Sequence, residues 1–259
     1  MKKHTLSALL FSTALLAACN ATLPTQTAAA PCTIAEGSDA NSALLLAAKE
    51  GDAANARCLL DSGADANIAD GDGSTALMLA AGRGHTDIVQ NLIDKGAQVG
   101  ADQGNGFTAL MGAAGNGRTD TVRLLLDKGA PVGTAYRDGS TALIAAAAGG
   151  HTDTARLLLE RGAQVNAAND KGATALIIAA LQGHADTVRL LLDKGANVNA
   201  VVTQGKAAGH SALDIAQANG HTDIVRMLRA AGAKSAKSAK SAKSAKSAKG
   251  AKKATRAKR

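Results

Sequence analysis

The stretch TALMGAAGNGRTDTVRLLLDKGAPVGTAYR at residues 108–137 decides the fold, because close copies of it recur along the chain. Threonine or serine followed by Ala-Leu occurs at six positions, which are Ser42, Thr75, Thr108, Thr141, Thr174 and Ser211. The first four intervals are 33 residues each, and the last is 37 residues. A fixed period of this length indicates a tandem repeat array. We therefore predict about six repeats, near residues 41–73, 74–106, 107–139, 140–172, 173–209 and 210–232.

The third copy predicts that each repeat forms two short helices. An apolar first helix is expected over residues 108–114, and the glycines of 115–117 interrupt it. A second helix is expected from Thr119 to Lys128, where Gly129 follows. Glycine takes the left-handed conformation that ends many helices at little cost. Because two such helices cannot bury their apolar faces alone, the repeats should stack into an all-α solenoid.

Three motifs within the repeat resemble those of the ankyrin repeat. G-x-T-x-L enters the first helix, G-H precedes the second helix, and L-L-x-x-G-A ends it. The best copies are Gly73–Leu77 with Gly84-His85, Gly139–Leu143 with Gly150-His151, and Gly172–Leu176 with Gly183-His184. Where the family has T-P-L-H, this chain has Ala76, Ala109, Ala142 and Ala175 for proline, and Met78, Met111, Ile144 and Ile177 for histidine. The resemblance covers residues 41–232 and implies an ankyrin solenoid that binds other proteins.

Two features depart from the regular period. Residues 201–209 belong to a connection that is four residues longer than the 33-residue period requires. Long connections are often functional, and insertions in surface loops are also tolerated, so the sequence leaves both explanations open. In the last repeat, Gln217 and Arg229 stand where the second repeat has Ala81 and Ile93. Polar residues at these positions predict an exposed end face that caps the solenoid.

Residues 1–18 have the pattern of an export signal. Lys2 and Lys3 precede a run of mostly apolar residues from 6 to 18, which is too short to span a bilayer comfortably. Leu16-Ala17-Ala18-Cys19 resembles the bacterial lipoprotein signal. The resemblance implies cleavage before Cys19 and attachment of lipid to it. The alternative is an ordinary signal peptide, cut in the same place, with an incidental cysteine.

Residues 19–40 are then expected to be a lipid anchor and a tether to the array. Enterobacterial-type lipoproteins with aspartate after the modified cysteine are retained in the inner membrane. Asn20 therefore implies the outer membrane. The expected location is the bacterial envelope, with the array facing the periplasm.

Export also allows the remaining cysteines to pair, because the periplasm permits disulfides. The first repeat has no repeat before it, and a Cys32–Cys58 bridge would pin the leading segment against that open side. The alternative is two unpaired thiols.

Residues 233–259 are predicted to form a disordered basic tail of Ala-Lys-Ser triplets. Of the 29 basic residues, eleven lie in this tail and two near the start, so 16 remain against 21 acidic residues, a net charge of about −5 for the rest. The overall net charge of +8 therefore comes from the tail. The tail is a candidate to bind anionic lipid, lipopolysaccharide, peptidoglycan or, if the chain is not exported, nucleic acid. The residues concerned are Lys234, Lys237, Lys240, Lys243, Lys246, Lys249, Lys252, Lys253, Arg256, Lys258 and Arg259. The alternative is a tail that only keeps the chain soluble.

No arrangement of residues predicts catalysis, a cofactor or a metal site. His85, His151, His184 and His221 occur one per repeat, so neighbours should lie about 10 Å apart, which is too far to share a zinc ion. A structural role is favoured for them. Residues 65–76 contain several acidic and amide side chains, but Asp70 and Ala76 occupy the sixth and twelfth places, where a calcium loop needs glycine and glutamate.

In ankyrin arrays, partners usually contact the turn before each T-x-L and the solvent side of the first helix. Carried over by alignment, this implies a protein-binding surface that includes Arg83, Phe107, Asn116, Tyr136, Arg137, Lys171, Leu181 and Gln182. After removal of the signal, Phe107 and Tyr136 are the remaining aromatic residues. Because aromatic and arginine side chains dominate binding hot spots, Phe107, Tyr136 and Arg137 are the proposed centre. The alternative is that Tyr136 simply packs over Phe107.

The sequence thus favours a non-enzymatic scaffold that is lipid-anchored, faces the periplasm and binds an unidentified protein. Similar exported bacterial ankyrin proteins are associated with envelope and oxidative-stress functions, which implies a supporting role in stress defence. One alternative is a polyanion-binding protein driven by the tail. Another is a secreted ankyrin effector that acts in a host cell.

Overall fold

The structure is a computed structural model, and it describes residues 32–34 and 37–235. Within these ranges the chain forms twelve α-helices, and its extended contacts are isolated β-bridges rather than strands. The helices are α1 (Ala40–Glu50), α2 (Ala53–Asp61), α3 (Ala76–Arg83), α4 (Thr86–Asp94), α5 (Ala109–Gly115), α6 (Thr119–Asp127), α7 (Ala142–Gly149), α8 (Thr152–Glu160), α9 (Ala175–Gln182), α10 (Ala185–Asp193), α11 (Ala212–Ala218) and α12 (Thr222–Ala230). The expected six helix pairs and the all-α class are confirmed.

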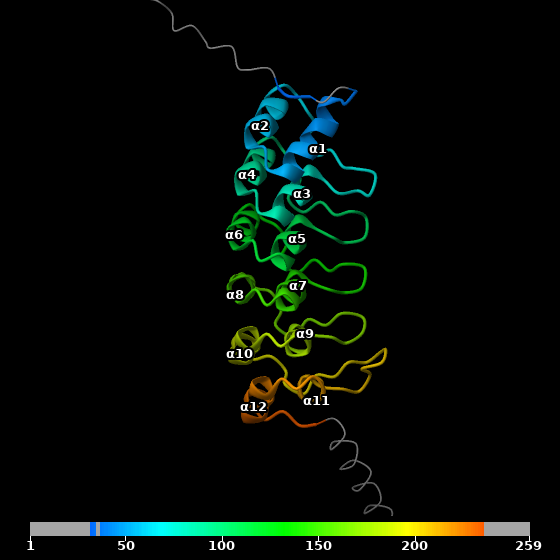
Figure 1. The fold of residues 1–259 in the computed structure, drawn as a ribbon, viewed down its shortest axis with the longest axis vertical. Coiled ribbons are helices and arrows are strands. Elements are labelled where there is room, and N and C mark those ends of the chain that lie inside the picture. Colours follow the sequence, from blue (N-terminus) through cyan, green and yellow to red (C-terminus); the bar gives the residue numbers. More distant parts are fainter. Residues whose placement is uncertain (1–31, 35–36, 236–259) are drawn as a thin grey trace, which may run out of the picture. The chain divides into compact units, whose positions relative to one another are not determined.

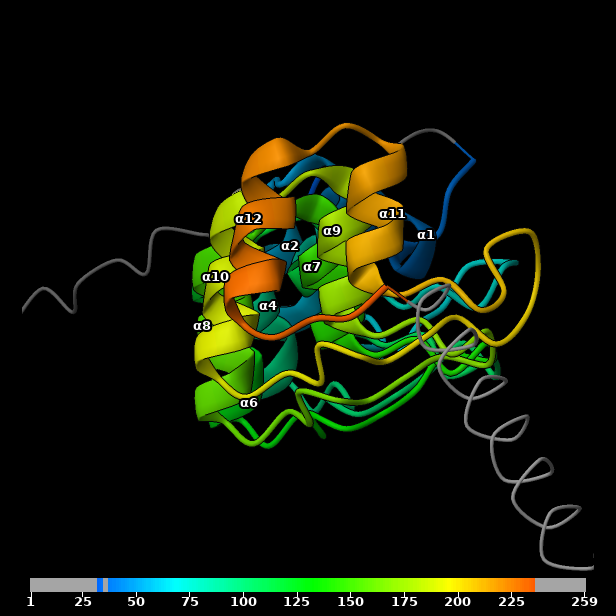
Figure 2. The same ribbon diagram turned by 90° about the horizontal axis from the view of Figure 1, so that it is seen from below.

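The helix pairs stack in chain order (Figure 1). The odd-numbered helices, which come first in each repeat, form one column, and the even-numbered helices form a second column beside it. Turns project from the array on the side of the first column, as Figure 2 shows. We call these turns the fingers. Each is closed by a β-bridge, and their bounds are 69–75, 102–108, 135–141, 168–174 and 201–211.

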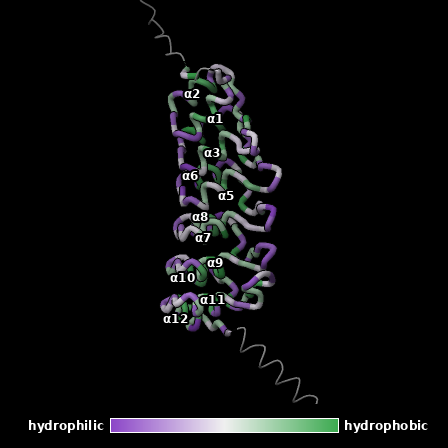
Figure 3. Tube along the Cα trace, turned by 45° about the vertical axis from the view of Figure 1, so that its right-hand side comes forward, coloured by the Kyte–Doolittle hydropathy of each residue, from purple (hydrophilic) through white to green (hydrophobic). Residues whose placement is uncertain are grey.

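A continuous apolar core fills the space between the helices (Figure 3). The leucine of the repeated motif is the most regular member of this core. Leu77, Leu110, Leu143 and Leu176 are each at most 2% exposed. Hydrophilic residues gather on the fingers and on the outer side of the second helices (Figure 3). The repeats therefore share one core, as a solenoid requires.

From the second repeat onward, the threonine or serine of the motif is the N-cap of the first helix, whereas α1 begins at Ala40 with Asp39 as its N-cap. In the third repeat, the backbone N–H of Met111 donates to Thr108 Oγ1 at 3.3 Å. This bond satisfies one of the N–H groups that have no partner within the helix. Met111 is only 5% exposed, so an apolar side chain fills the position where the family pattern has histidine.

The histidines that precede the second helices join neighbouring repeats. His151 Nε2 donates to the Gly115 carbonyl at 3.1 Å, and His184 Nε2 donates to the Ala148 carbonyl at the same distance. The His151 ring also lies against Gly117, whose φ is +66°. A Cβ on that glycine would come within 2.4 Å of the ring, so glycine leaves room for the contact. The predicted structural role of these histidines is confirmed.

The leading segment covers the open side of the first repeat. A disulfide joins Cys32 to Cys58 with a Cα–Cα distance of 5.5 Å. The side chain of Asn55 exchanges two hydrogen bonds with the backbone of Thr33, each 2.9 Å long. Residues 32–34 therefore lie against α2, on the side of the first repeat where no repeat precedes it.

At the other end, the start of the expected tail belongs to the folded array. The backbone N–H of Lys234 donates to Asn199 Oδ1 at 3.0 Å. Ser235 Oγ donates to Asp214 Oδ1 at 2.6 Å. The array thus extends to Ser235, three residues beyond the boundary expected from composition. Gln217 and Arg229 are exposed, which agrees with the predicted end cap.

None of the helices in the described part of the chain is long and apolar enough to cross a membrane. The expected signal over 1–18, Cys19 and the tail residues from 236 onward lie outside the described residues.

Candidate protein-binding surface

Two cavities open on the finger side of the array, and each is lined by both finger and first-helix residues. The first has a volume of about 470 Å³ and lies between the third and fourth repeats. The second has a volume of about 610 Å³ and lies between the fifth and sixth repeats. Cavities of this size accommodate several side chains of a partner.

The first cavity contains the aromatic pair. Phe107 and Tyr136 contact each other edge to face, with ring centroids 6.3 Å apart and planes at 87°. The guanidinium of Arg137 lies 5.2 Å from the Tyr136 ring centroid, in cation–π contact. Both rings are only partly buried against the core. The aromatic pair therefore packs internally and still offers surface to a partner.

The turn chemistry explains why the Tyr136 ring reaches the cavity. At the equivalent place in the second repeat, Asp70 Oδ1 accepts hydrogen bonds from two backbone N–H groups of its own finger. A tyrosine cannot make these short-range bonds. In the fourth repeat Asp138 Oδ1 takes over and accepts from the N–H of Ser140 at 2.9 Å. The Tyr136 ring is thereby left to pack beside Phe107.

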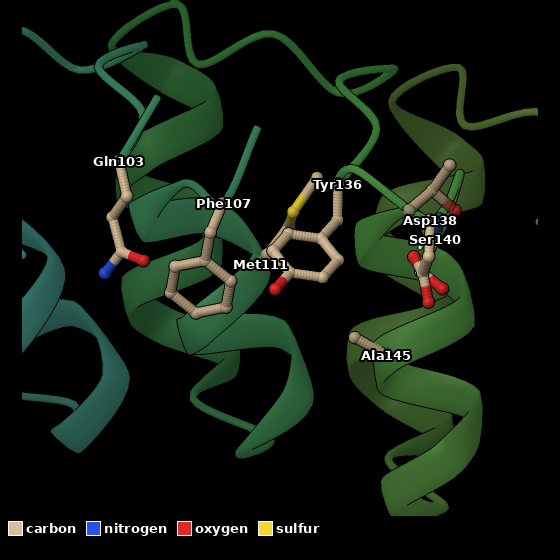
Figure 4. Close-up of a pocket in the computed structure, with 8 residues that line it drawn as sticks. Gln103, Phe107, Met111, Tyr136, Asp138, Ser140 and Ala145 are labelled. Atoms are coloured by element: carbon tan, nitrogen blue, oxygen red, sulfur yellow. Dashed lines mark hydrogen bonds between the residues drawn. The ribbon is translucent and has the colours of Figure 1, made fainter. Parts of the chain in front are cut away.

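Polar groups face the aromatic pair across this cavity. Figure 4 shows Phe107 and Tyr136 near Met111, with Asp138 and Ser140 on the same finger as Tyr136 and Ala145 below them. An apolar floor with a few polar groups at one side is a common design for binding sites. The arrangement can receive an apolar side chain and hydrogen-bond the polar atoms next to it.

The other predicted residues fall in separate places. Lys171 and Leu181 line the second cavity. Three further predicted residues are exposed at the C-terminal ends of first helices, next to the turn that leads to the second helix. They are Arg83 on α3, Asn116 after α5 and Gln182 on α9. The predicted surface is thus two cavities with a row of polar residues along the helix ends, and not one compact patch.

Sequence reasoning did not identify several residues of this surface. Gln103 and Met111 line the first cavity, and Lys206, Ile178 and Ile215 line the second. Alignment of the repeats places Ile178 and Ile215 one turn inside their first helices, beside the predicted Leu181. The signal that could have identified them is the change from small residues at the aligned positions of the central repeats, Gly112 and Ala145, to isoleucine in the last two repeats.

No group of three or more histidine, cysteine or acidic residues in the described ranges is placed to hold a metal ion. The residues that line the two cavities offer apolar floors with hydrogen-bonding and charged groups beside them.

Stacked helix pairs with projecting fingers define an α-solenoid, a class in which the exposed finger side is the usual binding surface. The family model for ankyrin repeats (3 copies) matches the chain at residues 14–103, 44–136, 99–169, 131–202 and 166–239. This chain belongs to the ankyrin repeat family. No curated protein matches it significantly. Membership supports a protein-binding scaffold, since ankyrin repeat proteins are typically interaction modules without catalysis.

Proposed function

We propose that this chain is a non-enzymatic protein-binding scaffold, held in a bacterial envelope by lipid on Cys19 and facing the periplasm. The observation that carries the binding role is the partly exposed aromatic pair, Phe107 and Tyr136, in a cavity on the finger side. Aromatic and arginine side chains contribute most strongly to protein interfaces. Arg137 lies beside the pair and adds such a group.

The compartment rests on the sequence Leu16-Ala17-Ala18-Cys19. The Cys32–Cys58 disulfide supports an oxidising compartment, because cytoplasmic thiols are kept reduced. Intact mass of the chain made in a bacterial host, beside a Cys19→Ala control, tests the anchor. A mature chain that starts at Cys19 with added acyl mass is the expected result. An uncleaved chain would instead favour nucleic acid as the partner of the tail, or a host-cell effector.

Affinity capture with crosslinking from native envelopes tests the binding surface. The double change Phe107→Ala and Tyr136→Ala is expected to reduce capture of the main crosslinked partner at least about tenfold, since each aromatic hot spot contributes roughly 2 kcal/mol or more. Arg123→Ala is the matched control, because Arg123 is exposed on α6, a second helix. Undiminished capture by the double variant would reject the aromatic centre. The identity of the captured protein would also test the proposed role in stress defence.

The basic tail supports a second binding role, for anionic lipid or another envelope polyanion. Its charge of +11 from residue 233 onward is the observation that favours it. A truncation to test it should end after Ser235 and not at Gly232, because Lys234 and Ser235 make contacts that cap the array. The shortened chain is expected to bind anionic vesicles much more weakly than the full chain. Equal binding would remove the tail from this role.

A further inference from the structure

The extra residues of the last finger build one wall of the second cavity. The N–H of Val202 donates to the His210 carbonyl at 3.0 Å, which closes the loop on itself. The N–H of Thr203 donates to the Lys171 carbonyl at 2.7 Å, and the Gln204 side chain donates to the same neighbouring finger at 3.0 Å. The insertion is therefore held against the fifth repeat, and the cavity beside it is a built feature of the array.

The floor of this cavity is apolar and comes from α9 and α11. Ile178, Leu181 and Ile215 line it, and Leu181 remains 42% exposed. At the position of Leu181, the third and fourth repeats have Gly115 and Ala148. A large apolar side chain is thus exposed here, where the central repeats have almost none.

The titratable groups that line the cavity are all basic. They are Lys171, Lys206 and His210, and no acidic residue of the described chain lines it. Both lysines are exposed, and neither forms an ion pair with any described residue. The rest of the chain before the tail carries more acidic than basic residues. The rim is therefore a local positive site above an apolar floor.

We propose that this cavity, which we call the loop groove, binds a segment of a partner protein in which leucine-like side chains are flanked by aspartate or glutamate. The apolar side chains fill the floor, and the carboxylates lie beside Lys171 and Lys206. Complementary charge gives such contacts their selectivity against other segments. The proposal rests on the proposed scaffold function and specifies the chemistry of the partner.

Fluorescence anisotropy of three labelled twelve-residue peptides on the full chain in detergent tests the loop groove. The first peptide has leucines flanked by glutamates, the second has serine for leucine, and the third has lysine for glutamate. The serine peptide measures non-specific attraction to the basic tail, since it keeps the negative charge. We expect the leucine–glutamate peptide to bind at least about tenfold more tightly than either control. Equal affinity for the leucine and serine peptides would overturn the proposal.

Substitutions already present at aligned positions provide variants that should fold. Leu181→Ala copies Ala148, and Lys171→Asp copies Asp138. Each should weaken binding of the first peptide severalfold, and Lys171→Asp combined with Lys206→Glu should weaken it about tenfold or more. Lys194→Asp is the control. Lys194 is exposed at the end of α10, and its substitution changes the net charge by the same amount as Lys171→Asp. Equal loss in the control and in Lys171→Asp would show that the groove is not the site.

Capture from native envelopes separates this inference from the scaffold function. If the Lys171→Asp, Lys206→Glu variant retains a partner that the Phe107→Ala, Tyr136→Ala variant loses, the loop groove is wrong and the scaffold function stands. If the unmodified chain crosslinks to no specific protein, the scaffold function itself fails.

Discussion

At the scale of single residues, the side chains that face each other across an interface between second helices form matched pairs. The hydroxyls of Thr119 and Thr154 lie 2.7 Å apart across one interface between second helices. Equivalent pairs are Thr86 with Thr121 at 2.6 Å and Thr152 with Thr187 at 2.8 Å. At the first and last interfaces, the same two positions hold Ala53 with Ile88 and Ala185 with Ile224. The chain therefore uses either two threonines or a small and a large apolar residue.

This matching predicts a non-additive effect of substitution. Thr154→Ile should destabilise the array by about 1–2 kcal/mol, because it crowds Thr119 and removes the hydroxyl partner of that residue. Adding Thr119→Ala recreates the pair seen at the ends and should recover most of the loss. Urea unfolding of the single and double variants measures the coupling. Strictly additive effects would show that the pairs are independent.

One residue shows why the histidine motif was an incomplete guide. In the third repeat Arg118 stands where the second, fourth, fifth and sixth repeats have histidine. A Cβ added to Gly84 would lie only 2.7 Å from Arg118 Cδ. The aliphatic part of the arginine side chain therefore covers this glycine, as the histidine rings cover the equivalent glycines of other repeats. The sequence predicted the histidine role from their spacing. It could not predict the arginine contact, because that contact depends on the shape of the stem and not on ring chemistry.

At the scale of secondary-structure elements, asparagine side chains join successive turns after the second helices. Asn67 Oδ1 accepts from the N–H of Gln98 at 2.8 Å, and Asn166 Oδ1 accepts from the N–H of Asn197 at 2.7 Å. The second and third repeats have Gly100 and Gly133 at this position and cannot make the bond. Two adjacent interfaces in the middle of the array therefore lack this connection.

Gly133→Asn should restore the bond and stabilise the array by about 1 kcal/mol. Gly133 does not have positive φ, and a Cβ added to it would have no neighbouring atom within 4 Å. The donor would be the backbone N–H of Gln164, which aligns with Gln98 and Asn197. Gly100→Asn is the matched control. The equivalent donor position there is Pro131, which has no N–H.

Both variants restrict the unfolded chain to a similar extent, and a Cβ on Gly100 would make only an ordinary van der Waals contact with Pro131 at 3.4 Å, so their difference reports mainly the hydrogen bond. Thermal unfolding followed by circular dichroism should give the higher midpoint for Gly133→Asn, by roughly 2–4 °C. Equal midpoints would mean that the asparagine bonds add nothing to the interface.

The elements themselves were largely predictable, and the cavities were not. The period and glycines predicted the helix pair of the third repeat within about one residue of α5 and α6. Local signals suffice there, because caps and apolar periodicity act within one repeat. The loop groove needs the insertion, Lys171 and Leu181 to meet across two repeats. Their meeting depends on how repeats stack, which periodicity alone does not specify.

At the scale of the whole array, each repeat contacts mainly its neighbours, so the stability of an end depends on its cap. The N-terminal cap consists of residues 32–34, the Cys32–Cys58 disulfide and the Asn55 side chain. The C-terminal cap uses Lys234 and Ser235. The N-terminal end is thus closed by a disulfide together with hydrogen bonds, and the C-terminal end by hydrogen bonds.

Opening the disulfide should therefore loosen the first repeat and leave the central repeats protected. Cys32 and Cys58 are 26 residues apart, and closure of a loop of this length stabilises a fold by about 3 kcal/mol. In a Cys32→Ser variant, hydrogen exchange should accelerate by up to about a hundredfold in α1 and α2, with little change in α7–α10. Cys58→Leu with Cys32→Ser is the packing control, because Leu124 occupies the aligned position in the third repeat. If non-reducing mass mapping finds both cysteines alkylatable in the chain made in a bacterial host, the disulfide does not form this cap. If exchange in the Cys32→Ser variant rises equally throughout the array, the disulfide does not stabilise this end in particular.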